Sequence, residues 1–429
     1  MFTEMLCLVS ICLGFFITCF FSQEFIGKEQ VEVKSNIEKV GEYEKIEFQI
    51  NLDTVYSNPF DPDEVDLSLD IKSPSGRIIN VPAFCYQYYE RKNIDKGVRT
   101  ADWLYPIGKP IWKARYAPSE IGRHFCSAKL KDRHGIIQSD IVSFDCIVSQ
   151  SKGFVRISKT NPCFFEFSNG SIFFPIGQNL AFIGETQYVS VRKAEEIFKK
   201  MSDNGANFAR IWACCEDWAM AIEARKSAWG RSWYWNPSMV QVPGRIGYLT
   251  DYKCIQITGE EGTEVNVSPC HPIALRPDTN YMVSGSARIG ADADLSLEIN
   301  NTKTKIIHDK NKEWTDFKYE FVTSPNEWWL DNMRFVLNKK GIAWIEDLSI
   351  KEASGEAELL WEADVNRPAM GYYNQLDCFM LDKILESAEE NSIYLQLCLL
   401  TRDLYMDLLK DDNSPEYQKA INYAKKLLR

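Results

Sequence analysis

The hydrophobic and polar positions of this chain follow a two-residue period in its first third. Between Gln30 and Val148, segments such as VEVKS, KIEFQINL, VDLSLDIKSP and HFCSAKLKD alternate apolar and polar residues, as half-buried antiparallel strands do. Turn signals separate these segments, including SPSG at Ser73–Gly76 and DRHG at Asp132–Gly135. The pattern predicts about seven short strands and favours an immunoglobulin-like β-sandwich over residues 28–149.

A helical period replaces this alternation after residue 190. One predicted helix covers Val191–Asn204 and ends at Gly205, and another covers Gln375–Asn391. Three short apolar runs accompany them, FFPIGQN, FARIW and IYLQLCLL, and polar residues lie at or just after the end of each run. Strands and helices in alternation are typical of an α/β barrel, whose site lies at the carboxyl ends of its strands.

The alternating pattern returns between the two helices, from about Gly244 to Glu352. The segments CIQITG, NYMVSGSARIG, LSLEIN, WTDFKYEFVT, MRFVLN and IAWIEDLSI are typical of strands separated by turn residues. Because the helical pattern resumes afterwards, we interpret residues 244–353 as a second β-sandwich inserted into a loop. Such an insertion costs little, since loop-closure entropy grows only with the logarithm of loop length.

The chain begins with an apolar segment, Met5–Phe21, which has the length of a signal-peptide core with its flanks. Ser22 is a candidate cleavage residue, so residues 1–22 are predicted to direct export to the periplasm, the cell surface or the medium. The start of the segment lacks Lys and Arg and carries Glu4. An uncleaved anchor and a lipoprotein modified at Cys19 therefore stay open as alternatives. No membrane span is expected in the mature chain.

Composition and motifs exclude several classes of protein. The formal net charge of −11, without a cluster of Lys and Arg, argues against nucleic acid as a partner. The 13 cysteines include no CxxC pair and no histidine at zinc-ligand spacing, and Cys254 with Cys270 is one open disulfide pairing. No dinucleotide, phosphate-loop or zinc-protease motif occurs, so no cofactor is predicted. A structural calcium ion at Asp347 with Glu260 or Glu261 is a further hypothesis, and solvated surface carboxylates are the alternative.

Two features indicate a site. Arg210 lies in the middle of an apolar run, where a charge is costly unless it is paired, so it marks either a structural ion pair or a functional site. Aromatic residues crowd a polar loop further on, where they form either core packing or a wall that faces a sugar. These residues are Trp229, Trp233, Tyr234 and Trp235.

Several motifs together resemble a known arrangement. They are YSNPFDPDEVDLSLDIKSPSG, WKARYAPSEIGRHFC, FFPIGQN, GANFARIW and LQLCLLTRDLYM. The chain resembles secreted bacterial glycoside hydrolases of clan A, with barrels like those of family 5 cellulases behind an immunoglobulin-like domain of unknown function. The insert resembles a jelly-roll carbohydrate-binding module that ends in IAWIEDLSI. The resemblance implies the first part of a (β/α)8 TIM barrel in residues 153–240 and 366–429.

The resemblance also implies roles for individual residues in binding a carbohydrate. Arg210 matches an arginine that hydrogen-bonds the nucleophilic glutamate, and Asn179 matches a residue at the mouth of the barrel. Trp212 and Trp218 are candidates for stacking on sugar rings, with core packing as the alternative for Trp212. The full set of candidate substrate-binding residues is Asn179, Arg210, Trp212, Trp218, Arg402 and Asp403.

The chain departs from this family in its carboxylates. Retaining members use two carboxylates about 5 Å apart, one as acid/base and one as nucleophile. No Asn-Glu pair occurs in a predicted barrel strand; the pair Asn326-Glu327 lies in the insert, and Glu216 and Asp217 follow the second strand. We therefore assign no catalytic residue and expect the catalytic glutamates beyond Arg429, in a longer parent of which this chain is a fragment.

Three hypotheses for the function follow. The first is a retaining glycoside hydrolase that cleaves O-glycosyl bonds of an oligo- or polysaccharide in the full-length parent. The second is a non-catalytic carbohydrate-binding or adhesive surface protein. The third is a structural module that uses its β-sandwiches for contacts with proteins.

Overall fold

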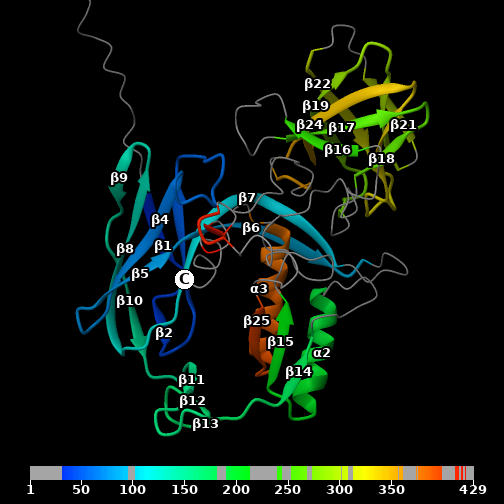
Figure 1. Cartoon of the computed structure of the whole chain (residues 1–429). Helices are drawn as coiled ribbons and strands as arrows, with labels where there is room; N and C mark the ends of the chain where they lie inside the picture. The colour runs from blue at the N-terminus through cyan, green and yellow to red at the C-terminus, as the bar shows by residue number, and fades with distance from the viewer. Residues whose placement is uncertain are drawn as a thin grey trace, which may run out of the picture.

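A computed structural model describes residues 31–94, 102–180, 190–212, 239–243, 253–267, 273–300, 302–307, 313–355, 357–360, 373, 375–398, 411–414, 417–418 and 421. Three bodies can be followed in it: an N-terminal pair of sheets, a small parallel sheet with two helices, and a second pair of sheets (Figure 1). The predicted signal segment lies outside the described residues. None of the described helices combines the length and apolarity that crossing a bilayer requires.

The N-terminal body is a β-sandwich. One sheet has the order β1 (Val31–Ser35), β3 (Ile46–Leu52), β7 (Trp103–Tyr116) and β6 (Phe84–Lys92). The other has the order β2 (Lys39–Gly41), β10 (Val142–Ile147), β8 (Gly122–Asp132), β4 (Val65–Lys72) and β5 (Ile78–Pro82), and β9 (Gly135–Gln138) pairs with β8. The alternating residues of both sheets meet in one core, as the two-residue period predicts. The immunoglobulin assignment of this sandwich stays a prediction. Buried members of its core are Phe48, Leu69, Ile71, Leu130 and Phe144.

The second body is a three-stranded parallel sheet with the order β14 (Gly177–Asn179), β15 (Phe208–Trp212) and β25 (Tyr394–Cys398). Helices α2 (Val191–Asp203) and α3 (Gln375–Glu390) pack together, and their buried residues share a core with Ala209 and Ile211 of β15. A small antiparallel sheet precedes it, formed by β11 (Val155–Ile157), β12 (Phe165–Phe167) and β13 (Ile172–Phe173).

The prediction of a (β/α)8 TIM barrel, even an incomplete one, is wrong. The described residues are mostly strands and contain two complete helices, whereas a barrel needs eight parallel strands, each followed by a helix. The three parallel strands form an open sheet in the described part of the chain. The local alternation of strands and helices was identified correctly, but a barrel also requires closure, which a local pattern does not encode.

The third body is a second β-sandwich that interrupts the parallel sheet in sequence. Its five-stranded sheet has the order β16 (Met239–Pro243), β17 (Lys253–Gly259), β24 (Gly341–Glu352), β19 (Asn280–Ile289) and β22 (Thr315–Val322). Its four-stranded sheet has the order β18 (Glu264–Asn266), β23 (Met333–Leu337), β20 (Leu295–Ile299) and β21 (Thr302–Ile307). Fully buried members of its core include Ile255, Leu295, Phe335 and Ile345.

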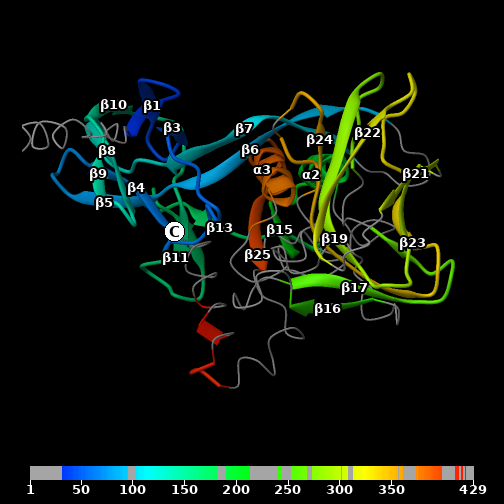
Figure 2. The ribbon, with the colours of Figure 1, turned by 90° about the horizontal axis from the view of Figure 1, so that it is seen from above.

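One long antiparallel ribbon, β6 with β7, reaches all three bodies (Figures 1 and 2). At one end β7 pairs with β3 of the N-terminal sandwich. In the middle, a bulge near Gln87 frees a backbone N–H, which donates to Oε1 of Gln375 on α3 at 2.9 Å. Tyr89 lies 5.1 Å from Phe379 of α3, measured between ring centroids. Helix α3 is therefore held against the ribbon by both polar and apolar contacts.

Ion pairs tie the same ribbon to its neighbours. Arg115 of β7 donates to Glu47 of β3 at 2.9 Å and to Asp382 of α3 at 2.6 and 2.8 Å. Lys113 donates to the other oxygen of Glu47 at 2.6 Å. Burial raises the pKa of Glu47, but the hydrogen bonds from Lys113 and Arg115 outweigh it and hold that pKa below its ordinary value.

The start of α2 is capped twice. Ser190 accepts a hydrogen bond from the backbone N–H of Lys193, as an N-cap residue does. Asp102, directly before β7, accepts a second one from the N–H of Val191 at 2.7 Å. Arg91 of β6 then bridges Asp102 and Glu195 of the helix. The ribbon thus supplies a carboxylate to the positive end of the helix.

We predict that Asp102→Ala destabilises the body that contains α2. The substitution removes the partner of the Val191 N–H and one partner of Arg91, and an unsatisfied buried group costs about 1–3 kcal/mol. Urea denaturation followed by far-UV circular dichroism measures the loss. Asp66→Ala, at an exposed position of β4, is the control and is expected to change stability by less than about 0.5 kcal/mol. Equal midpoints for the two variants would contradict the role of Asp102.

Candidate functional site

Polar side chains form a row across the parallel sheet. The register places Asn179 of β14 opposite Arg210 of β15, and Arg210 opposite Gln396 of β25. Ala209 and Ile211, the neighbours of Arg210, are buried in the core that contains α2 and α3. Because successive side chains of a strand point to opposite faces, Asn179, Arg210 and Gln396 lie on the face away from the helices. Arg210 is half-buried there, and the two amides are exposed.

This row includes two of the residues singled out from the sequence. Asn179 and Arg210 lie side by side, and Gln396 is an addition that sequence reasoning missed. Trp212 ends β15, where its Cα lies opposite that of Cys398. The other candidates lie outside the described residues, as do the aromatic loop and the two acidic residues after the second strand. They are Trp218, Arg402, Asp403, Glu216, Asp217, Trp229, Trp233, Tyr234 and Trp235.

A second polar face covers the outside of the five-stranded sheet of the second sandwich. Gln256, Trp344 and Arg288 lie opposite one another on β17, β24 and β19, and alternate with core residues of the same strands. Trp314, just before β22, completes this row. The Cζ atom of Arg288 is 4.0 Å from the ring centroid of Trp344 and 5.6 Å from that of Trp314. The guanidinium therefore lies between two tryptophan rings, an arrangement stabilised by cation–π attraction.

One hydrogen bond orients Trp344 within this row. Trp344 donates its indole N–H to Oε1 of Gln256 at 3.1 Å. The Nε atom of Arg288 is buried and makes no hydrogen bond to any described residue. A buried, charged donor without an acceptor is costly.

A second row runs beside the first. Glu346 of β24 lies opposite Ser286 of β19, which lies opposite Asp316 of β22. Ser286 donates a hydrogen bond to the Asp316 carboxylate. Glu346 is 4% exposed and Ser286 is 3% exposed. Cys254 of β17 is fully buried, and this burial, together with the charge of Glu346, raises the pKa of its thiol to about 12.

The outer face of the five-stranded sheet thus combines two half-buried tryptophans with donors and acceptors of several kinds. Indole rings contact the C–H faces of a ligand, while amide, guanidinium, hydroxyl and carboxylate groups bind its oxygens. Within the described residues, no three His, Cys, Asp or Glu side chains converge as metal ligands. Glu260, one of the calcium candidates, forms an ion pair with Lys340. The outer face of the five-stranded sheet is therefore suited to binding a ligand that has both apolar surfaces and hydrogen-bonding groups.

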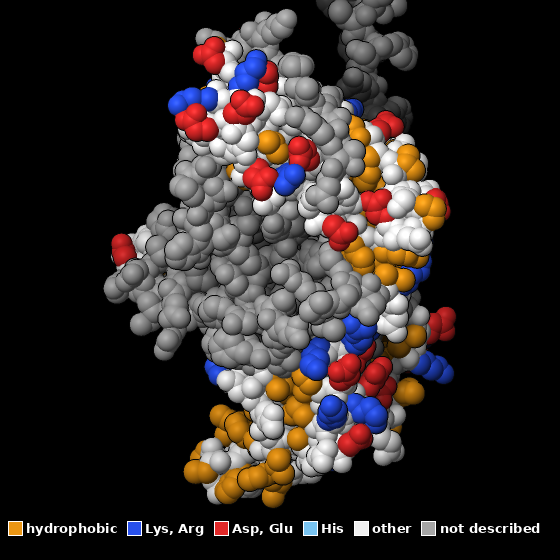
Figure 3. All heavy atoms as spheres, turned by 90° about the vertical axis from the view of Figure 1, so that its right-hand side faces the viewer, with side chains coloured by type: hydrophobic (Ala, Val, Ile, Leu, Met, Phe, Trp, Pro, Cys, Tyr) orange, Lys and Arg blue, Asp and Glu red, His pale blue; other side chains and the backbone are white. Residues whose placement is uncertain are grey.

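The rest of the surface differs in character. Acidic and basic side chains are mixed over the second sandwich, and apolar ones gather at the opposite end of the molecule (Figure 3). That end holds the sheet β11–β13, where Ile172 is 76% exposed and Phe174 64% exposed.

Comparison with known proteins gives matches among solved structures. No protein-family model and no curated protein matches this sequence. Among solved structures, a predicted glycoside hydrolase from Bacteroides vulgatus aligns with a TM-score of 0.40 and 13% identity over 91% of this chain. The alignment covers 47% of that protein, so this chain spans about half its length.

Carbohydrate-binding modules are also among the structural neighbours. The C-terminal module of the laminarinase LamC from Zobellia galactanivorans aligns with a TM-score of 0.22 and 15% identity, over 30% of this chain and 97% of the module. A module of lichenase 5A from Cellvibrio mixtus, solved with cellotriose, aligns with a TM-score of 0.22 and 12% identity, over 31% of this chain and 95% of the module. All these TM-scores are below 0.5, so the likenesses assign neither a family nor an activity to this chain.

We predict that Cys254 resists alkylation in the native protein. A thiol whose pKa rises from 9.0 to about 12 has roughly a thousandfold smaller thiolate fraction, and Cys254 is also fully buried. Cys163 is exposed and serves as the internal control. Iodoacetamide labelling at pH 8, followed by peptide mass spectrometry, is expected to modify Cys163 at least 100-fold faster. Equal alkylation rates of Cys254 and Cys163 would show that Cys254 is accessible to the reagent on the outer face of the five-stranded sheet.

Proposed function

We propose that this protein binds a carbohydrate on the outer face of the five-stranded sheet of its second sandwich. The observation that carries the proposal is the row in which Arg288 lies between Trp344 and Trp314. A sugar has apolar C–H faces and a rim of hydroxyl groups, and this row offers indole surface next to charged and neutral hydrogen-bonding groups.

The face is preorganised for a ligand. Trp344 is fixed on one side by Gln256 and on the other by Arg288, so little side-chain freedom remains to be lost on binding. The guanidinium of Arg288 covers part of one ring face of Trp344. Trp344 is only half-buried, so the rest of its indole surface is available to a ligand. The strand that carries Trp344 and Glu346 is IAWIEDLSI, the segment on which the resemblance to carbohydrate-binding modules rests.

The charges of the face favour a neutral sugar. Arg288 is the cation of the first row, and Glu346 and Asp316 are the carboxylates of the second row. A carboxylate or sulfate on the ligand would meet Arg288 favourably but would be repelled by both acidic residues. A neutral hydroxyl donates to a carboxylate and accepts from a guanidinium, so it satisfies both rows.

Trp344→Ala and Arg288→Ala are each expected to weaken binding to a neutral polysaccharide at least tenfold. Affinity electrophoresis of the full chain against a panel of neutral and acidic polysaccharides identifies the ligand, and isothermal titration calorimetry measures the change. Arg334→Ala is the matched control, because it removes an arginine that pairs with Glu264 and Glu298 on the four-stranded sheet of the same sandwich. Wild-type affinity in both test variants, or an equal loss in the control, would refute the proposal.

A glycoside hydrolase is the second candidate, and the row of Asn179, Arg210 and Gln396 favours it. These side chains would bind substrate or orient a carboxylate in the longer parent proposed from the sequence, which would supply the two glutamates of a retaining mechanism. This chain by itself is expected to release no reducing ends from a polysaccharide that it binds. Release of reducing ends by the wild-type chain, lost in Arg210→Ala, would instead favour hydrolysis by residues already present.

A further inference from the structure

The tip of the β6–β7 ribbon enters the core of the second sandwich. Trp103 and Tyr105 are the first and third residues of β7, and they are 0% and 2% exposed. Both belong to the same buried cluster as Ile255 and Ile345, which lie in the five-stranded sheet. The ribbon tip therefore fills part of the interior of a sandwich that begins more than 100 residues later in the sequence.

Polar contacts fix Trp103 in that interior. Its indole N–H is shared between the carbonyl oxygens of Leu275 at 3.1 Å and Trp328 at 3.2 Å. Its ring stacks on Tyr105 at 5.6 Å and meets the edge of Trp328 at 5.7 Å. Lys92, at the end of β6, lies over the rings of Trp103 and Trp328. No polar atom of Trp103 is left unsatisfied by this burial.

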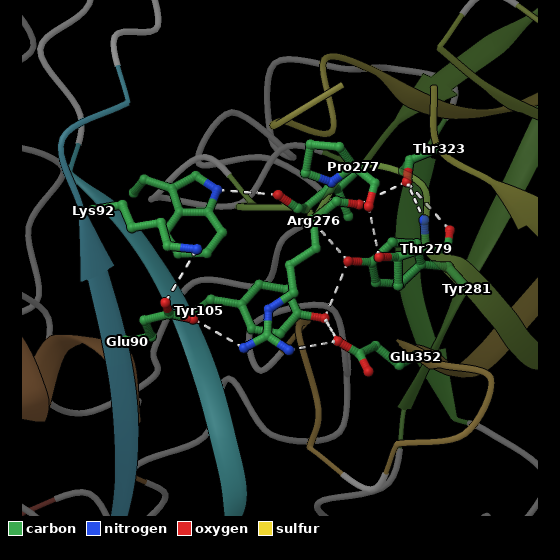
Figure 4. Close-up of polar contacts among 11 residues, drawn as sticks. Glu90, Lys92, Tyr105, Arg276, Pro277, Thr279, Tyr281, Thr323 and Glu352 are labelled. Atoms are coloured by element: carbon green, nitrogen blue, oxygen red, sulfur yellow. Dashed lines mark hydrogen bonds and ion pairs between the residues drawn. The ribbon is translucent and has the colours of Figure 1, made fainter. Parts of the chain in front are cut away.

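A charged network closes over the same contact (Figure 4). Tyr105 donates to Oε1 of Glu352 at 2.6 Å, and its hydroxyl group lies 3.1 Å from that of Tyr281. Arg276 bridges Glu352 of the sandwich and Glu90 of the ribbon, at 3.2 and 2.9 Å. Its guanidinium lies 4.2 Å from the centroid of the Tyr105 ring. The backbone of Arg276 is held in turn by Tyr281 and Thr323.

We propose that the ribbon tip is an integral part of the core of the second sandwich, so that this sandwich does not fold as a module on a flexible tether. Contacts between domains of one chain are commonly polar and allow relative motion. Here the contact consists of two large, completely buried aromatic side chains inside a hydrogen-bonded rim. Since α3 packs on the middle of the ribbon and Asp102, next to Trp103 at the ribbon tip, caps α2, the sandwich keeps a fixed orientation relative to the parallel sheet.

Hydrogen–deuterium exchange of the full chain tests this proposal by locating where a substitution acts. Trp103→Ala is expected to raise exchange at least tenfold in peptides from β19 and β24, which are more than 170 residues away in the sequence. Trp112→Ala is the matched control, because Trp112 lies on the same strand but packs against the N-terminal core. It is expected to raise exchange in β3 and β4 and to leave β19 and β24 unchanged.

Two milder variants keep the proposal testable if Trp103→Ala does not fold. Tyr105→Phe removes the hydroxyl that meets Glu352 and Tyr281, and Arg276→Gln removes the charge that links Glu352 to Glu90. Each is expected to raise exchange in β24 at least threefold while exchange in β8 stays at the wild-type rate. Unchanged exchange of β19 and β24 in all three variants would overturn the proposal and show an autonomous sandwich.

Discussion

The pairing of β6 with β7 is the constraint on which the rest of the molecule depends. Residues that face one way along this ribbon pack on α3, and residues at its tip enter the second sandwich. A shift of the register by one residue would reverse every side chain and move Trp103 out of the core. The bulge at Gln87 changes which side chains point to each face of the ribbon. The backbone N–H that the bulge frees donates a hydrogen bond to Gln375 of α3. One strand pair therefore sets the positions of three bodies.

The two polar faces arise from the strand registers of two different sheets. The row of Asn179, Arg210 and Gln396 exists because three parallel strands align their polar residues while α2 and α3 cover the opposite face. The row around Arg288 exists because β17, β24 and β19 place Gln256, Trp344 and Arg288 at the same level of one sheet. Arg288 has a buried Nε without a hydrogen-bond partner among the described residues, so it stabilises the fold less than an apolar residue would. The proposed carbohydrate site would give this arginine a role.

The sequence predicted the local elements well and their assembly poorly. Helix α2 was predicted from apolar spacing, and Gly205, with φ at 77°, ends it as expected. The resemblance to glycoside hydrolases assigned Asn179 and Arg210 to one site, and the register of β14 with β15 sets them side by side. The TIM barrel was wrong, since closure depends on pairing between distant strands. Gln396 lies on the same face of the sheet as Arg210, but the sequence analysis did not single it out. Trp344 and Arg288 were missed because only the register between residues far apart puts them in one row, and the burial of Trp103 depends on a contact with Leu275.

The proposed carbohydrate site lies on the outer face around Arg288. Hydroxyl-radical footprinting of the full chain, with and without a saturating polysaccharide, measures this directly, because tryptophan rings are oxidised in proportion to their exposure. Oxidation of Trp344 and Trp314 is expected to fall at least threefold when the ligand is bound, while oxidation of Trp112 in the N-terminal sandwich does not change. Binding that leaves Trp344 and Trp314 unprotected, or that protects Trp112 instead, would show that the ligand does not bind on the face around Arg288.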